Sequence, residues 1–283
     1  MSKNNDLIKK LTLCFYKGSH VDLTPGDMKL LTWDNQAMLL NQTIYSSLFK
    51  KYPCNKSFSR LFFKKLIEIL EADQEVHDDI YKFVCSTMNN NENIYNYQYY
   101  VINNDLNNIV TIKETKNMVI NGTTGLKTWE AALMLSDWSL SNEQIFSNKK
   151  ILELGSGVGF TGITIAKHCG IESMLMTDCV LMLDWNEIDD LSSDLIPDII
   201  IGSDIVYDPS ILQPLLNVLN LFHNRNSKVH IYIASIIRNQ DTFNEFLRVL
   251  ESSKFIYEKI YLTKQGFIDW NEDVDKCLLK ITK

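Results

Sequence analysis

The stretch Ile151-Leu-Glu-Leu-Gly-Ser-Gly-Val-Gly-Phe-Thr-Gly162 decides the fold of this chain. It joins a short apolar run of strand character to closely spaced glycines, and residues 160–169 then have a helical pattern. Glycines placed after a strand let the backbone turn tightly and approach a ligand closely. The stretch therefore predicts a β-strand, a ligand-binding turn and a helix.

Outward from this stretch, short apolar segments alternate with helical patterns. The predicted helix before it covers residues 128–140, with Thr128 as its N-cap. The predicted strands are 149–155, 173–178, 198–207, 228–235, 255–262 and 277–283, and the predicted later helices are 209–222 and 240–252. This alternation indicates a mainly parallel sheet covered on both faces. The fold class is α/β, a Rossmann-like doubly wound sheet in which ligands bind beyond the carboxyl ends of the strands.

Residues 1–118 have a different pattern and are predicted to form a mainly helical accessory region before a domain at 119–283. Residues 43–88 carry apolar positions every three to four residues, which is typical of amphipathic helices. Between Asn-rich turns, residues 94–102 and 109–112 have the content of strands.

Composition and charge exclude several classes of function. The 283 residues include 28 Lys and Arg against 35 Asp and Glu, so the net charge of −7 disfavours non-specific binding to nucleic acid. A mean hydropathy of −0.11 and the lack of a long apolar run argue against a membrane span. The six cysteines form no C-x-x-C, and none has a histidine at zinc-ligand spacing. We expect no metal site, and a reduced chain in the cytoplasm without a secretory signal.

The glycine stretch leaves two classes of cofactor open. Its last part satisfies G-x-G-x-x-G, the pattern of nicotinamide and flavin nucleotide sites. Glu153, however, precedes the first glycine, where a carboxylate would repel a pyrophosphate and suit the cationic end of an aminoacyl cofactor. Asp178 ends the next predicted strand, where it could accept hydrogen bonds from ribose hydroxyls or act as a cap or turn residue.

A second group of residues, Ser203-Asp204-Ile205-Val206-Tyr207, ends the predicted strand 198–207. The carboxylate of Asp204 could pair with an amine, while the phenol of Tyr207 could offer a hydrogen bond and an aromatic wall. In the alternative, Tyr207 packs on the following helix and Asp204 caps it. The residues alone do not decide between these roles.

From about residue 119 onward, the sequence resembles the seven-strand protein-lysine N-methyltransferases, and most of all those that act on elongation factor 2. The resemblance is carried by residues 122–138 (GTTGLKTWEAALMLSDW), 151–162 (ILELGSGVGFTG), Asp178-Cys179, 183–185 (LDW) and 203–207 (SDIVY). A weaker similarity continues upstream through residues 49–72 and 75–83.

This resemblance implies a methyltransferase that uses S-adenosylmethionine, with the domain at 119–283 as its catalytic part and elongation factor 2 as its protein partner. Asp204 and Tyr207 would face the substrate lysine. The residues implied to line the cofactor site are Trp129, Gly155, Ser156, Gly157, Trp185 and Ser203. Because methyl transfer is an in-line displacement, positioning the lysine nitrogen and keeping it neutral should supply most of the rate.

The sequence departs from the family pattern after Asp178. Asp178 and Asp184 are only six positions apart, whereas adjacent parallel strands need a crossover of about a dozen residues or more. We expect the sheet to lack one strand and one helix, with 180–183 extending the preceding strand, forming a hairpin, or leaving that edge of the sheet incomplete. A catalytically impaired or binding-only relative is therefore the alternative function. Small-molecule methyltransferases and nucleotide oxidoreductases are less favoured.

Overall fold

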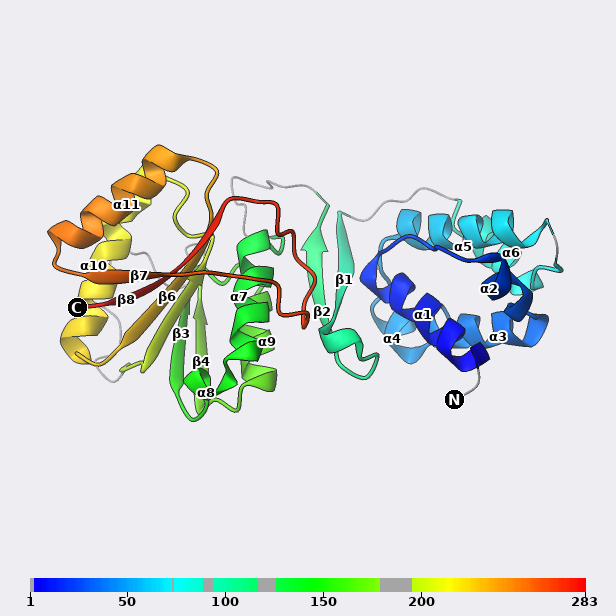
Figure 1. Ribbon diagram of the computed structural model, residues 1–283, viewed down its shortest axis with the longest axis horizontal. Helices are drawn as coiled ribbons and strands as arrows, with labels where there is room; N and C mark the ends of the chain where they lie inside the picture. Colours follow the sequence, from blue (N-terminus) through cyan, green and yellow to red (C-terminus); the bar gives the residue numbers. More distant parts are fainter. Residues whose placement is uncertain (1–2, 73, 89–93, 117–125, 179–194) are drawn as a thin grey trace. The chain divides into compact units, whose positions relative to one another are not determined.

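The computed structural model describes residues 3–72, 74–88, 94–116, 126–178 and 195–283. The chain divides into two compact units, Met1–Asn117 and Met118–Lys283 (Figure 1). In the described residues no helix is both long enough and apolar enough to span a membrane. The accessory role of residues 1–118 and the catalytic role of residues 119–283 remain predictions.

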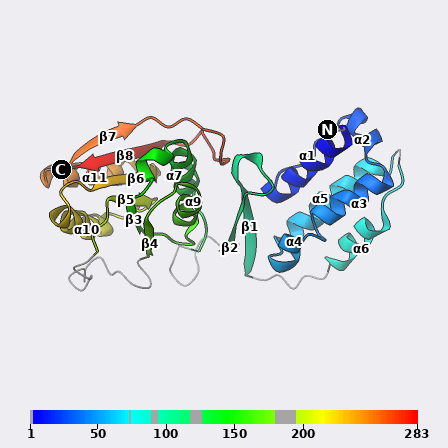
Figure 2. The same cartoon turned by 90° about the horizontal axis from the view of Figure 1, so that it is seen from below.

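The first unit is helical and ends in a hairpin (Figure 2). Its helices are α1 (Lys3–Lys17), α2 (Pro25–Leu30), α3 (Trp33–Gln42), α4 (Ser47–Lys51), α5 (Lys56–Leu70) and α6 (Asp78–Ser86). The antiparallel strands β1 (Tyr95–Val101) and β2 (Ile109–Thr115) confirm the strands predicted from the sequence. The core of this unit is aromatic, since Phe15 packs its ring against those of Phe62 and Phe63.

The second unit is built around one twisted sheet. Its strands are β3 (Lys150–Leu154), β4 (Ser173–Thr177), β5 (Ile199–Ser203), β6 (His230–Ile236), β7 (Ile256–Ile260) and β8 (Lys276–Thr282). They lie in the order β4-β3-β5-β6-β8-β7, in which the first four are parallel and β8 runs antiparallel to both neighbours. Within the described residues the sheet thus has six strands, one fewer than the seven-strand pattern.

Helices cover both faces of this sheet. They are α7 (Glu130–Ser141), α8 (Glu143–Phe146), α9 (Phe160–His168), α10 (Leu212–Arg225) and α11 (Gln240–Ser252). Figure 1 shows α7 and α9 on one face and α10 and α11 on the other. The apolar sides of α10 and α11 form one buried cluster with β5 and β6. The doubly wound α/β fold predicted from the sequence is confirmed.

Some predicted boundaries are wrong for local reasons. The N-cap of α7 is Trp129 rather than Thr128, and no side chain caps that helix end. The strand predicted at 198–207 ends at Ser203, because Asp204 has a φ of +53° that an extended strand cannot continue. The alternatives for residues 180–183, together with Trp185, lie outside the described residues.

Candidate functional site

The glycine turn lies at the carboxyl ends of β3 and β4. Gly155, Gly157 and Gly159 have φ values of +66°, +52° and +81°, in the left-handed region that glycine enters without a steric penalty. A Cβ on Gly155 would lie 2.5 Å from a methyl carbon of Ile205, so only glycine fits. The Ser156 N–H donates to the Thr177 carbonyl at 2.9 Å and thereby fixes the turn to the end of β4.

Glu153 lies beneath this turn rather than in an open cleft. The side chain is 1% exposed, and its Oε2 accepts a hydrogen bond from the Gly162 N–H at 3.1 Å. Burial raises the pKa of Glu153 to about 8, because the charged form would lose its hydration. Burial therefore favours the protonated carboxyl in the folded chain. The expectation that Glu153 repels a pyrophosphate remains a prediction, as does its direct contact with a cofactor.

Asp178 follows the end of β4, beside the same turn. Its charge contributes to the raised pKa of Glu153, which indicates that the two carboxyl groups are near each other. The Thr177 hydroxyl donates to the Glu153 carbonyl at 2.8 Å and links the ends of β3 and β4. A carboxylate after β4 thus stands at the edge where ligands of doubly wound sheets bind.

Asp204 stands at the end of β5, just after Ser203, which pairs with Ala234 of β6. Its Oδ1 accepts from the Ile236 N–H at 2.9 Å, and its Oδ2 accepts from Nη2 of Arg238 at 3.0 Å. The carboxylate is 6% exposed. The alternative role of Asp204 as a helix cap is wrong, because Asp208 is the residue that caps the following turn, through the Ser210 N–H.

Tyr207, the second predicted catalytic residue, lies close behind Asp204 in the sequence. Tyr207 is 58% exposed, and both of its predicted roles, packing on the following helix and contact with a substrate, remain predictions. An exposed phenol near a buried carboxylate is compatible with contact with a substrate.

Arg238, which the sequence analysis missed, lies between two predicted site residues. Its guanidinium carbon is 5.0 Å from the centre of the Trp129 ring, while its Nη2 bonds to Asp204. The guanidinium therefore joins a residue assigned to the cofactor with one assigned to the substrate. The available signal was a basic residue two positions after β6, at the same edge of the sheet as Asp204.

A loop between β7 and β8, residues 261–275, which we call the strap, supports this edge. The buried Asp137 of α7 accepts hydrogen bonds from four N–H groups of the strap, at 2.7–3.0 Å: those of Gln265, Phe267 and Ile268 and the indole N–H of Trp270. Glu130 accepts from the Asn271 N–H, and the Ile237 N–H donates to the Asp275 carbonyl at 2.8 Å. The strap thus fixes the start of α7, where Trp129 lies, and the end of β6, where Arg238 follows.

The residues at this edge fit S-adenosylmethionine. Among the described residues, the backbone N–H groups of Gly157 and Val158 have no hydrogen-bond acceptor, and both residues are half-buried. Two such donors in a glycine turn suit a carboxylate such as that of the aminoacyl end. Asp178 offers the acceptor that ribose hydroxyls need.

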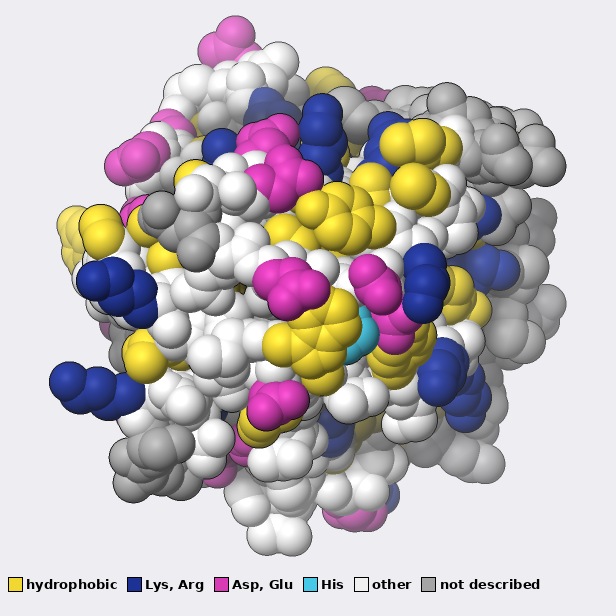
Figure 3. All heavy atoms as spheres, turned by 90° about the vertical axis from the view of Figure 1, so that its right-hand side faces the viewer, with side chains coloured by type: hydrophobic (Ala, Val, Ile, Leu, Met, Phe, Trp, Pro, Cys, Tyr) yellow, Lys and Arg dark blue, Asp and Glu magenta, His cyan; other side chains and the backbone are white. Residues whose placement is uncertain are grey.

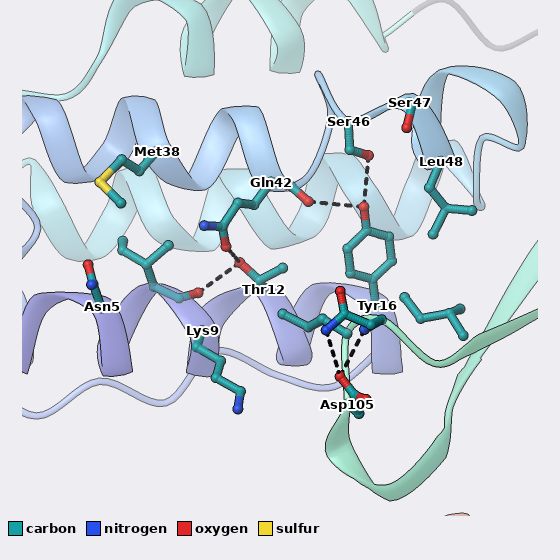
Figure 4. Close-up of a pocket in the computed structure, with 14 residues that line it drawn as sticks. Asn5, Lys9, Thr12, Tyr16, Met38, Gln42, Ser46, Ser47, Leu48 and Asp105 are labelled. Carbon is teal, nitrogen blue, oxygen red and sulfur yellow. Dashed lines mark hydrogen bonds between the residues drawn. The ribbon is translucent and has the colours of Figure 1, made fainter. Parts of the chain in front are cut away.

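The first unit contains a pocket of about 600 Å³, lined by α1, α3, residues 46–48, residues 105–107 and Ile109 (Figure 4). Its polar groups bond mainly to one another: the Tyr16 hydroxyl lies between the Gln42 carbonyl and Ser46 Oγ, at 3.0 and 2.8 Å. Thr12 donates to the Gln42 side chain at 3.0 Å. None of the predicted site residues lines this pocket, and its satisfied polar groups favour a structural role.

Comparison with known families gives a match over more than half of the chain. The sequence profile of a family described as lysine methyltransferase matches residues 106–182 and 179–253. The two matched segments overlap at residues 179–182, where the sequence predicts the shortened link after Asp178.

Similar proteins carry methyltransferase names. The human protein-lysine N-methyltransferase EEF2KMT is 27% identical, over 86% of this chain and 85% of its own length. The Mus musculus protein of the same name is 28% identical, over 78% of this chain and 77% of its own. Protein-lysine N-methyltransferase EFM3 of Chaetomium thermophilum is 27% identical, over 49% of this chain and 50% of its own.

Proposed function

Because this chain belongs to the lysine methyltransferase family, uses S-adenosylmethionine and acts on a protein, we propose that it methylates a lysine of translation elongation factor 2 in the cytoplasm. The observation that supports this most is the close approach of the glycine turn to the segment after β5. A Cβ on Gly155 would lie 2.5 Å from Ile205, which directly follows Asp204. A methyl donor bound at the glycine turn and an acceptor bound after β5 would therefore lie close together.

The choice of elongation factor 2 has two supports. The human and mouse relatives share the name EEF2KMT, and each matches most of this chain. The segments quoted in the sequence analysis resemble the same group of enzymes, including a weaker similarity within the first unit. The proposal would fail if another protein were the preferred substrate.

We assign the following roles within this proposal. Ser156, Gly157 and Asp178 bind the aminoacyl and ribose parts of the methyl donor, together with Trp129, Gly155, Trp185 and Ser203. Glu153 keeps the first turn of α9 in place through Gly162. Asp204 and Tyr207 orient the substrate amine at the carboxyl edge of the sheet.

The chemistry requires little more than positioning. S-adenosylmethionine supplies an activated methyl group when bound. This chain must bring a neutral lysine nitrogen in line with that methyl group, and such positioning can account for most of a rate enhancement. A buried carboxylate that accepts from an amine N–H and an exposed phenol beside it are suited to this task.

The first unit offers a surface for a protein partner. On the face shown in Figure 3, hydrophobic and acidic side chains lie next to one another. Trp33 is exposed within this unit and stacks on His77, with 4.3 Å between the ring centres. Aromatic residues are enriched at protein interfaces, which supports an accessory role of this unit in holding the substrate.

The test is methylation of purified elongation factor 2 with labelled S-adenosylmethionine, read by mass spectrometry. Asp204→Asn should lower kcat by about a hundredfold, because the amide no longer orients the amine in the same way. The matched control is Asp208→Asn, since Asp208 caps a turn and asparagine caps equally well. The assignment of Asp204 is wrong if both variants retain the activity of the wild type.

The alternative, a binding-only relative, is favoured by the short link after Asp178. The same preparation separates the two functions through calorimetric titration with S-adenosylhomocysteine. Binding together with transfer supports the enzyme. Binding without transfer to elongation factor 2 or to other proteins supports the alternative.

A further inference from the structure

The carboxylate of Asp204 already has a cationic partner within this chain. Nη2 of Arg238 is 3.0 Å from Oδ2 of Asp204, and the arginine side chain is 49% exposed while the carboxylate is 6% exposed. Arg238 thus covers the group that the proposed function assigns to the substrate amine.

Resting on that proposed function, we propose that Arg238 neutralises Asp204 and so helps the substrate lysine to lose its proton before methyl transfer. A lysine beside an unpaired carboxylate is stabilised as an ammonium, which has no lone pair for attack. An opposite charge at this distance raises the pKa of an amine by about 1–3 units. An arginine keeps its positive charge at working pH and cancels most of this effect.

The contacts of Arg238 allow it to remain in place during this step. The guanidinium carbon lies over the Trp129 ring, 5.0 Å from the ring centre, and the N–H of the preceding Ile237 donates to the Asp275 carbonyl. The carboxylate of Asp204 is held from the other side by the Ile236 N–H. Each carboxylate oxygen accepts one of these two hydrogen bonds and retains a lone pair, so Asp204 can still accept an N–H from a neutral amine.

The substrate ammonium first releases one proton to solvent and becomes a neutral amine. The nitrogen lone pair then forms the N–C bond to the methyl carbon, while the electrons of the C–S bond pass to sulfur. The products are a methylated ammonium and the neutral thioether S-adenosylhomocysteine.

Other ionisable groups stand on the elements around this edge. They lie on β3, after β4, after β5, on α7 and before β8: Glu153, Asp178, Tyr207, Glu130 and Asp275. Glu153 is buried against Gly162, and Glu130 accepts from the Asn271 N–H. In the part of the chain that the structure describes, Arg238 is the cationic side chain in contact with Asp204.

The decisive variant is Arg238→Met, studied by the pH dependence of kcat and KM for elongation factor 2. We expect kcat at pH 7 to fall about tenfold and to recover near pH 9, as the acidic limb of the profile moves up by about one unit. KM should stay equal or fall, because an unpaired Asp204 binds the ammonium better. Arg238→Lys keeps the charge and should restore most of the wild-type profile.

The matched control is Arg248→Met, which removes an exposed arginine paired with Glu245 on α11 and should leave the profile unchanged. A loss of kcat by the same factor at every pH would overturn the proposal, because it would indicate a purely structural role. A rise in kcat would also overturn it, since Arg238 would then obstruct the substrate.

A second measurement needs no methyl transfer. Butylammonium, a mimic of the lysine side chain, is titrated into the protein saturated with S-adenosylhomocysteine. Arg238→Met should bind it several-fold more tightly than the wild type, and adding Asp204→Asn should remove the gain. If the wild type does not methylate elongation factor 2 but this gain is seen, the substrate assignment fails while the role of Arg238 stands. If no gain is seen, the role of Arg238 is wrong.

Discussion

Two regions of the second unit, the contact between α7 and the strap and the carboxyl edge of the sheet, each bury an aspartate. The hydrogen-bond donors to the two carboxylates differ. Asp137, on the strap side, is 1% exposed and accepts from four N–H groups, three of them in the backbone. Asp204, at the sheet edge, accepts from one backbone N–H and from one half-exposed arginine.

This difference separates a structural carboxylate from a functional one. The four donors to Asp137 are fixed by the fold and leave no room for a ligand. Of the two donors to Asp204, the arginine is half-exposed, so solvent or a ligand can reach it. Both carboxylates are buried, so the number of hydrogen-bond donors and the exposure of Arg238 carry the distinction.

The largest effect that tests this comparison is on stability. Asp137→Ala would leave four strap donors without their acceptor, and we expect the free energy of unfolding to fall by about 3–5 kcal/mol. Asp204→Ala exposes one backbone donor and an arginine that water can solvate, so its loss should be about 1–2 kcal/mol. Urea unfolding with unchanged m-values measures both.

The control for this pair is Asp137→Asn, which keeps one acceptor oxygen. Its free energy of unfolding should lie between those of the wild type and Asp137→Ala. Equal losses for Asp137→Ala and Asp204→Ala would contradict the distinction between the two carboxylates.

The sequence predicts the parts of this site that local signals specify. The glycine turn and the acid at the end of β5 follow from strand patterns and from glycine spacing within about a dozen residues. The anchor at Asp137 could not be predicted, because its partners lie 128–133 positions away. The pair of Asp204 and Arg238 spans 34 positions and depends on which strands are neighbours in the sheet.

The charge of Glu153 shows a different limit of sequence reasoning. Its position was predicted correctly, at the end of a strand before the glycines, but its protonation depends on how deeply the side chain is buried. Residue spacing does not report that depth.

Glu153 is a third buried carboxyl group of the second unit, and its Oε2 accepts a hydrogen bond from the Gly162 N–H. Its pKa is about 8 in the folded chain and 4.5 as a free side chain, so folding favours the protonated form. The stability that this group contributes is complete below pH 4.5 and is lost as the pH rises to about 8. Glu153→Gln should remove this loss and gain on the order of 3 kcal/mol over the wild type at pH 8.5.

The measurement is urea unfolding of both proteins at pH 5 and pH 8.5. Burial lowers the pKa of His168 and His230, which makes stability rise with pH and so opposes the effect of Glu153. Because both histidines remain in the variant, the difference between variant and wild type isolates Glu153. If the free energies of unfolding of variant and wild type differ by the same amount at both pH values, the carboxyl is charged in the folded chain.

The smallest effect comes from the residue that faces Glu153. A Cβ on Gly162 would lie 2.5 Å from Oε2 of Glu153 and 2.5 Å from the sulfur of Met176, so Gly162→Ala should cost about 1–3 kcal/mol. Gly26→Ala is the matched control, because its nearest atom would be 3.7 Å away and its φ is ordinary. The double variant Gly162→Ala with Glu153→Ala should lose less than the two single losses together, because shortening Glu153 makes room for the methyl group. Strict additivity would mean that Glu153 does not hold the start of α9, and the carboxyl beneath the glycine turn would then have the freedom to meet a ligand.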